Sequence, residues 1–238
     1  MYEADMNWDQ RVAADAALSE RVTFIRRTYM HVAGALVALT ILLAALVSFV
    51  PNEVLQSIFG RGGSIGMLLI LVLFYAVSYA ARNMAQANKP IGMQYAGLAL
   101  YTGMMAFMLW PAIWVSTNVA QYNGILGQAV ILTLALAAGL TASVFITKID
   151  FSFLRSFIVV MSFIAVGLIV AGILFRFDLG LVFSLGMVVL LSLCILYSTS
   201  NIMNHYPTNA YVAAALEIFS TVVVLFSWIL NILMRSRN

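Results

Sequence analysis

The chain has little charge, few histidines and lysines and a single cysteine, and these shortages exclude whole classes of protein. Charged residues make up 9% of the 238 positions and hydrophobic residues 63%, whereas soluble domains carry about 25% charged residues. A water-soluble domain is therefore excluded. The lone Cys194 lies in an apolar stretch, so an internal disulfide is impossible and we expect this side chain to pack as a small hydrophobe.

Residues that carry chemistry are also scarce. His31, His205 and one cysteine cannot build the usual zinc sites. The stretch GGSIG around Ser64 satisfies the G-x-S-x-G pattern, but it lacks the strand-to-helix turn and the nearby histidine that the pattern requires. Lys89 and Lys148 lie in connections, so no lysine is placed mid-span to form a retinal Schiff base. We expect no enzymatic activity and no cofactor.

Long apolar runs dominate what is present. Each is long enough to cross a hydrocarbon core of ~30 Å, and no alternating pattern indicates a barrel, so the spans must be helices. The sequence predicts an all-α membrane protein with seven transmembrane helices, at about residues 28–50, 64–82, 91–114, 124–147, 153–175, 179–200 and 211–234. Residues 1–27 form a polar, cytoplasmic tail in this prediction, and residues 235–238 form a short C-terminal tail.

The basic residues lie at span ends, where they set orientation rather than recruit nucleic acid. A cytoplasmic N-terminus collects eight of the twelve on the inner side: Arg11, Arg21, Arg26, Arg27, Arg82, Lys89, Lys148 and Arg155. It leaves Arg61, Arg176, Arg235 and Arg237 outside. We therefore expect an N-in protein with the lipid bilayer as its main partner and no nucleic-acid partner.

Small residues recur at four-residue spacing in several spans, which favours close approach of helix backbones. The pairs are Gly34 and Ala38, Gly92 and Ala96, and Gly180 and Ser184. They predict a tightly packed bundle.

Glu217 is the only acidic residue placed well inside an apolar span. It lies ~9 Å from the inner end of the last helix at 1.5 Å per residue. A charge at mid-membrane costs about 2.5–3.5 kcal/mol on insertion scales, so this carboxyl should be paired, hydrated or protonated. Arg82 is the nearest cation by depth, and Ser220 and Thr221 share the helical face of Glu217. The alternative is a carboxyl that only contributes to packing.

Three stretches carry a resemblance to a known family. They are ILYSTSNI at residues 195–202, KIDFSFL at residues 148–154 and ALEIF at residues 215–219. They resemble the transmembrane Bax inhibitor motif (Bax inhibitor-1) family, and most of all its bacterial members of the inner (plasma) membrane. The resemblance implies six helices around a central C-terminal helix and, in some members, a calcium or proton leak governed by two aspartates.

The chain departs from the family at both aspartates. Ser198 stands where the family pattern ILYD has the first, and Thr221 stands where the second is expected, one turn after Glu217. A single Glu beside Ser and Thr supplies one charge where two carboxylates offer calcium hard ligands. We therefore expect weak calcium affinity and no metal site.

Two functions remain open. In the first, the protein is a pH-sensitive leak channel for calcium or protons, in which ionisation of Glu217 opens a hydrophilic path lined by Ser198, Thr221, Arg82 and Ser220. In the second, it transports nothing and acts through its N-terminal tail as a regulator or substrate of a membrane-bound protease complex.

Overall fold

The computed structural model describes residues 12–60 and 62–237, and these ranges are helical throughout apart from short connections. The described elements are α1 (Leu18–Phe49), α2 (Asn52–Phe59), α3 (Gly63–Met84), α4 (Ile91–Asn118), the short 3-10 helix η2 (Ala120–Tyr122), α5 (Ile125–Thr147), α6 (Leu154–Phe175), α7 (Gly180–Asn204) and α8 (Tyr211–Arg235). Within the described ranges, seven helices are long and apolar enough to cross a membrane. The prediction of an all-α, seven-span membrane protein is confirmed.

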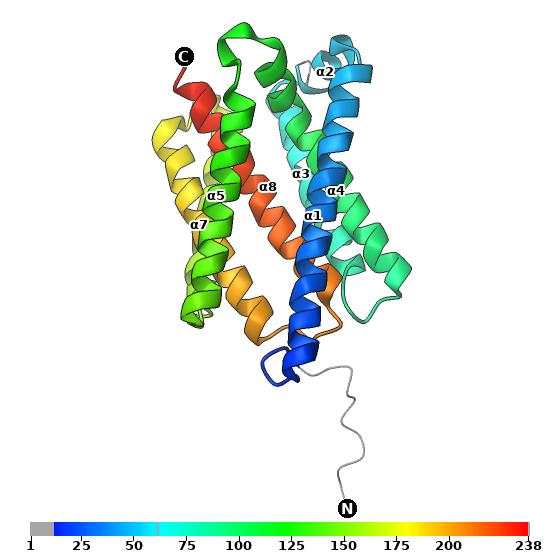
Figure 1. Cartoon of the computed structure of the whole chain (residues 1–238). Helices are drawn as coiled ribbons and strands as arrows, with labels where there is room; N and C mark the ends of the chain where they lie inside the picture. Colours follow the sequence, from blue (N-terminus) through cyan, green and yellow to red (C-terminus); the bar gives the residue numbers. More distant parts are fainter. Residues whose placement is uncertain (1–11, 61, 238) are drawn as a thin grey trace, which may run out of the picture.

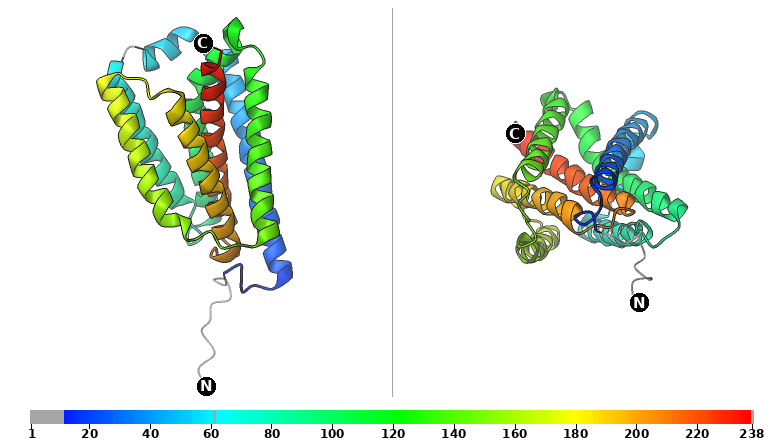
Figure 2. Two further views of the ribbon diagram at one scale, coloured as in Figure 1. Left: turned by 90° about the vertical axis from the view of Figure 1, so that its left-hand side faces the viewer. Right: turned by 60° about the horizontal axis from the view of Figure 1, so that its bottom comes forward.

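The long helices run up and down between two ends of the molecule (Figure 1). We call the end where α1 begins the lower end; it also holds residues 205–210, which connect α7 to α8. The upper end holds α2 and residues 176–179, which connect α6 to α7. Figure 2 shows α8 running between the two ends behind its neighbours.

Several boundaries differ from the sequence prediction, and α4 and α7 end at Asn118 and Asn204, four residues beyond the expected ends. α1 begins at Leu18, ten residues before the expected span. The backbone bonds of a helix are satisfied within the helix, so the chain stays helical beyond its apolar segment. α8 ends at Arg235, and Arg237 donates to the carbonyl oxygens of Gln121 and Asn123, so the last residues are held against the bundle. Residues 1–11 of the predicted tail lie outside the described residues.

α8 is the most enclosed of the spans. In its most apolar stretch 61% of the residues are buried, against 6% in α6. It packs against α1, α4, α5 and α7, while α3 packs mainly against α4 and α6. α6 instead exposes large side chains such as Phe163 and Phe175, as expected of a lipid-facing helix. The arrangement of six helices around a central seventh stays a prediction.

Close helix approach occurs at a glycine that the small-residue pattern did not single out. A Cβ on Gly97 in α4 would lie 2.6 Å from the backbone oxygen of Ala81 in α3. Gly34, Gly92 and Gly180 have open space where a Cβ would stand. The tight contact between α3 and α4 therefore depends on Gly97, because spacing along one helix cannot show which face meets a neighbour.

Candidate functional site at the lower end of helix α8

Glu217 lies in the second turn of α8, which begins at Tyr211. Its neighbours Ala214, Ala215 and Phe219 are fully buried, whereas Glu217 itself is half-buried. The apolar residues on both sides keep this part of α8 inside the bundle, so the carboxyl has to find its polar partner there.

Tyr206 supplies that partner. Its hydroxyl donates a hydrogen bond to Oε2 of Glu217 from the connection between α7 and α8. Burial raises the pKa of the Tyr206 hydroxyl above its usual value, and the negative charge of Glu217 raises it further. The hydroxyl therefore stays protonated and remains a donor to the carboxylate.

Arg82 does not form the expected pair with Glu217. Its Nη2 donates to the hydroxyl of the buried Ser220 at 2.9 Å, and its guanidinium lies 5.5 Å from the centre of the Tyr101 ring. The Tyr101 ring meets Phe219 of α8 edge to face at 6.2 Å. Arg82 thus ties α3 to α4 and α8 beside the carboxyl, through a hydroxyl and an aromatic face rather than an ion pair.

Ser220 and Thr221 contact the backbone of Glu217 rather than its carboxylate. Their hydroxyls donate to the carbonyl oxygen of Glu217 at 2.8 and 3.0 Å. This is the usual way in which Ser and Thr satisfy themselves inside an apolar helix. Ser220 also accepts the bond from Arg82, so it links the guanidinium to the turn of α8 that bears Glu217.

Ser198 is buried on α7, and no hydrogen bond joins it to Glu217 in the described part of the chain. The structure therefore brings Glu217, Ser220, Thr221 and Arg82 together, and it leaves Ser198 without a direct contact to them.

Two of the three stretches that carry the family resemblance meet at the lower end. The backbone N–H of Phe151 donates to Oγ of Ser200 at 2.9 Å, and this hydroxyl lies 3.3 Å from Oδ1 of Asp150. A hydrogen bond from the Ser152 backbone lowers the pKa of Asp150, and the nearby His205 acts in the same direction. Asp150 is exposed, and its contacts fasten the connection between α5 and α6 to α7.

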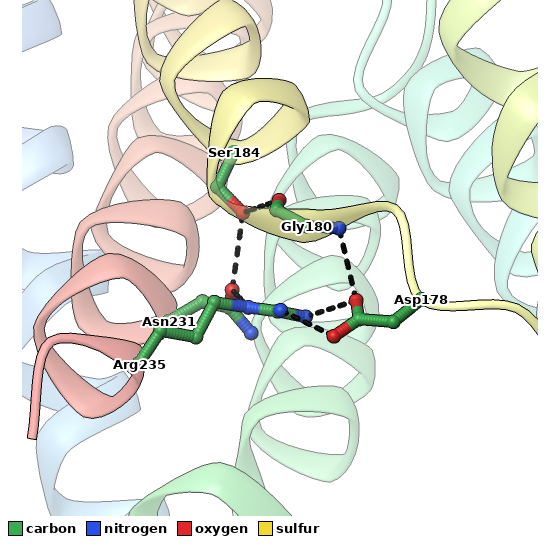
Figure 3. Close-up of polar contacts among 5 residues, drawn as sticks. All are labelled: Asp178, Gly180, Ser184, Asn231 and Arg235. Carbon is green, nitrogen blue, oxygen red and sulfur yellow. Dashed lines mark hydrogen bonds and ion pairs between the residues drawn. The ribbon is translucent and has the colours of Figure 1, made fainter. Parts of the chain in front are cut away.

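A second polar cluster lies at the upper end of α8 (Figure 3). Arg235 donates to both carboxylate oxygens of Asp178, at 2.6 and 2.7 Å, and its Nε donates to Asn231 at 2.8 Å. Ser184 of α7 completes the cluster through a 3.2 Å bond to the same oxygen of Asn231. These bonds join the connection before α7 to the end of α8.

The chemistry available at the lower site is that of one carboxyl group with a phenol donor. No group of three or more His, Cys, Asp or Glu side chains converges among residues 12–60 and 62–237. A calcium cage needs six to eight oxygen ligands, whereas a proton needs only one basic oxygen.

Sequence reasoning missed Tyr206 and Tyr101. Tyr206 follows His205 in the short connection between α7 and α8, and no periodic pattern predicts which way the side chain of a loop residue points. Tyr101 is one of many aromatic residues in apolar spans, and its role beside Arg82 follows only from the packing of α3 on α4.

The fold and this site define a multi-pass α-helical membrane protein in which, among the described residues, Glu217 is the one carboxyl group that is not exposed. Residues 21–238 match the family described as "Bax1-I: Inhibitor of apoptosis-promoting Bax1". The chain belongs to this family, the Bax inhibitor-1 family, as the three sequence stretches indicated. It matches no curated protein and no solved structure in the parallel comparisons.

Proposed function

We propose that this protein is a pH-sensitive cation leak of the Bax inhibitor type, with protons as the favoured ion and Glu217 as the titratable group. The observation that carries the proposal is the bond from Tyr206 to Glu217. It places a side chain of the connection between α7 and α8 directly on Glu217, the acidic residue that the sequence sets well inside an apolar span. We place the lower end in the cytoplasm and the protein in the cell's inner (plasma) membrane.

Orientation follows from the basic residues. Those described at the lower end are Arg21, Arg26, Arg27, Arg82, Lys89, Lys148 and Arg155, and those at the upper end are Arg176, Arg235 and Arg237. An excess of Lys and Arg marks the cytoplasmic side.

The Tyr206 contact reverses the direction of gating expected from the sequence. A hydrogen bond to an ionised carboxylate is roughly twice as strong as one to a neutral group. Ionised Glu217 therefore holds the loop closed, and protonation of Glu217 weakens the bond and releases it. In this proposal the leak rises as the lower side becomes acidic.

The test is proton flux in liposomes that contain the purified protein, measured over a range of internal and external pH. Glu217→Gln removes the charge and the titration, so we expect flux at neutral pH to rise about fivefold, the effect of losing the charge assistance. The pH dependence should disappear as well. Glu53→Gln, at an exposed position in α2, is the matched control. A Glu217→Gln variant with the pH profile of the unaltered protein would refute the proposal.

The alternative, a regulator or substrate of a membrane-bound protease, stays a prediction. Its support lies in the N-terminal tail, and residues 1–11 are outside the described part of the chain. Pulldown from native membranes with and without residues 1–20 tests it, since association that does not depend on the tail would count against it.

A further inference from the structure

The segment before α1 contacts the loop that carries Tyr206. We call residues 12–17 the strap and residues 205–210 the Tyr206 loop. The backbone N–H of Ala13 donates to the carbonyl oxygen of Tyr206 at 2.8 Å, and Val12 and Pro207 form an antiparallel bridge. Segments almost two hundred residues apart in the chain are therefore paired through their backbones at the lower end.

The strap is anchored at both of its sides. Ala13 has an exposed fraction of 0%, so its methyl group is enclosed by the protein. The N–H of Asp15 donates to the carbonyl oxygen of Val12 at 3.0 Å and closes a turn. α1 follows directly at Leu18, so a shift of the strap relative to α1 would be passed to the Tyr206 loop.

On the side of α1 the Tyr206 loop borders an open groove. An open groove of about 270 Å³ separates Thr208 from the first turns of α1, where Ser19, Glu20, Thr23, Phe24 and Arg27 line it. Within the loop, the N–H of Ala210 donates to the carbonyl oxygen of Pro207 at 3.0 Å. The strap, the bond from Tyr206 to Glu217 and the packing of the tyrosine ring against the core thus fix where Tyr206 stands.

We infer that the strap holds Tyr206 over Glu217, so that displacement of the segment before α1 uncovers the carboxyl group. A force or a partner acting on the N-terminal segment would then open the lower end without any change of pH. The consequence for ion flux rests on the proposed function, whereas the hold of the strap on the loop does not.

Two single substitutions test the hold of the strap. Ala13→Gln places a long polar side chain where the methyl group is fully enclosed, and Ala14→Gln makes the same change at an exposed neighbour. With the full chain in liposomes, hydrogen exchange of the amides in residues 205–210 should be about tenfold faster in Ala13→Gln, which corresponds to the loss of one or two net hydrogen bonds. Ala14→Gln should leave it unchanged. Equal exchange in both variants would overturn the inference.

A reversible crosslink tests the same inference by tightening the contact between the strap and the Tyr206 loop. This test does not depend on how Ala13→Gln folds. The described bond across the bridge joins Ala13, the residue after Val12, to Tyr206, the residue before Pro207, so Val12 and Pro207 form a non-hydrogen-bonded pair, with Cα atoms typically about 4.5 Å apart. That spacing suits a disulfide. The variant combines Val12→Cys and Pro207→Cys with Cys194→Ser.

Oxidation of this variant should slow exchange in the Tyr206 loop and lower proton flux, and a reductant should restore both. If exchange responds and flux does not, the strap stands and the proposed leak fails. If flux responds to Glu217→Gln while loop exchange is the same in the oxidised and reduced proteins, the leak stands and the strap is wrong.

Discussion

The two polar clusters at the ends of α8 give their carboxylates different partners. At the upper end Asp178 is 66% exposed and is held by both terminal nitrogens of Arg235. At the lower end the half-buried Glu217 receives a bond from a neutral phenol, while the nearby guanidinium of Arg82 goes to Ser220. Asp178 is paired directly with a cation at a water-exposed position, whereas Glu217 meets a neutral donor inside the bundle.

The difference bears on the proposed response to pH. The bonds from Arg235 lower the pKa of Asp178 to about 2, so this group stays ionised across the physiological range. The upper cluster is a fixed link between the end of α8 and the connection before α7. Glu217 has no direct cationic partner among the described residues, so a proton there changes the strength of its one observed side-chain bond.

The largest effect should come from the packing that brings Arg82 to the lower cluster. Gly97→Ala would place a Cβ 2.6 Å from the Ala81 oxygen and 3.0 Å from the Ala85 nitrogen, so the end of α3 must move away. We expect a loss of about 1–3 kcal/mol of stability, seen as a lower midpoint of thermal unfolding in detergent. Gly92→Ala, where a Cβ meets nothing within 4 Å, is the control and should be neutral or slightly stabilising. Equal effects of the two changes would show that Gly97 is not a contact point.

An effect of comparable or smaller size, specific to the lower cluster, is expected from Tyr206→Phe. This change removes the donor to Glu217 and keeps the ring, at a cost of about 1.5–3 kcal/mol for a bond to a charged group. Flux at neutral pH should rise at least as much as in Glu217→Gln, which keeps an accepting oxygen, and the double variant should add little beyond Tyr206→Phe, because both changes act on one bond. Tyr122→Phe at the upper end is the comparison, and an equal rise in flux there would show that the effect is not specific to the bond with Glu217.

The smallest effect should come from the upper cluster. Asp178→Asn breaks an exposed ion pair, so we expect a decrease of about 2 °C or less in the unfolding midpoint at pH 7. The folded-state pKa of Asp178 is lowered from 3.8 to about 2. The contribution of the pair is therefore complete above pH ~4 and is lost as the pH falls toward 2. The difference in unfolding midpoint between Asp178→Asn and the unaltered protein should shrink over that pH interval. A difference that persists at the lowest pH would mean that the upper cluster does not depend on the charge of Asp178.

Composition and periodicity were sufficient for the architecture. A chain with 9% charged residues and long apolar runs has to place its backbone bonds within helices in lipid, so the number and type of spans follow from local rules. The same rules identified Glu217, because a lone acidic residue in an apolar run is conspicuous. They also placed Arg82, Ser220 and Thr221 near it by depth and by helical face.

Only the tertiary structure decided what these groups contact. The depth of Arg82 in the membrane favoured it as the partner of Glu217. Its guanidinium instead donates to Ser220 and lies over Tyr101, because Gly97 fixes how α3 lies on α4. The partner that Glu217 does have, Tyr206, comes from a loop held by residues 12–17 at the other end of the chain. Periodicity describes one element at a time, whereas loop direction and contacts between distant segments arise only when the whole chain packs.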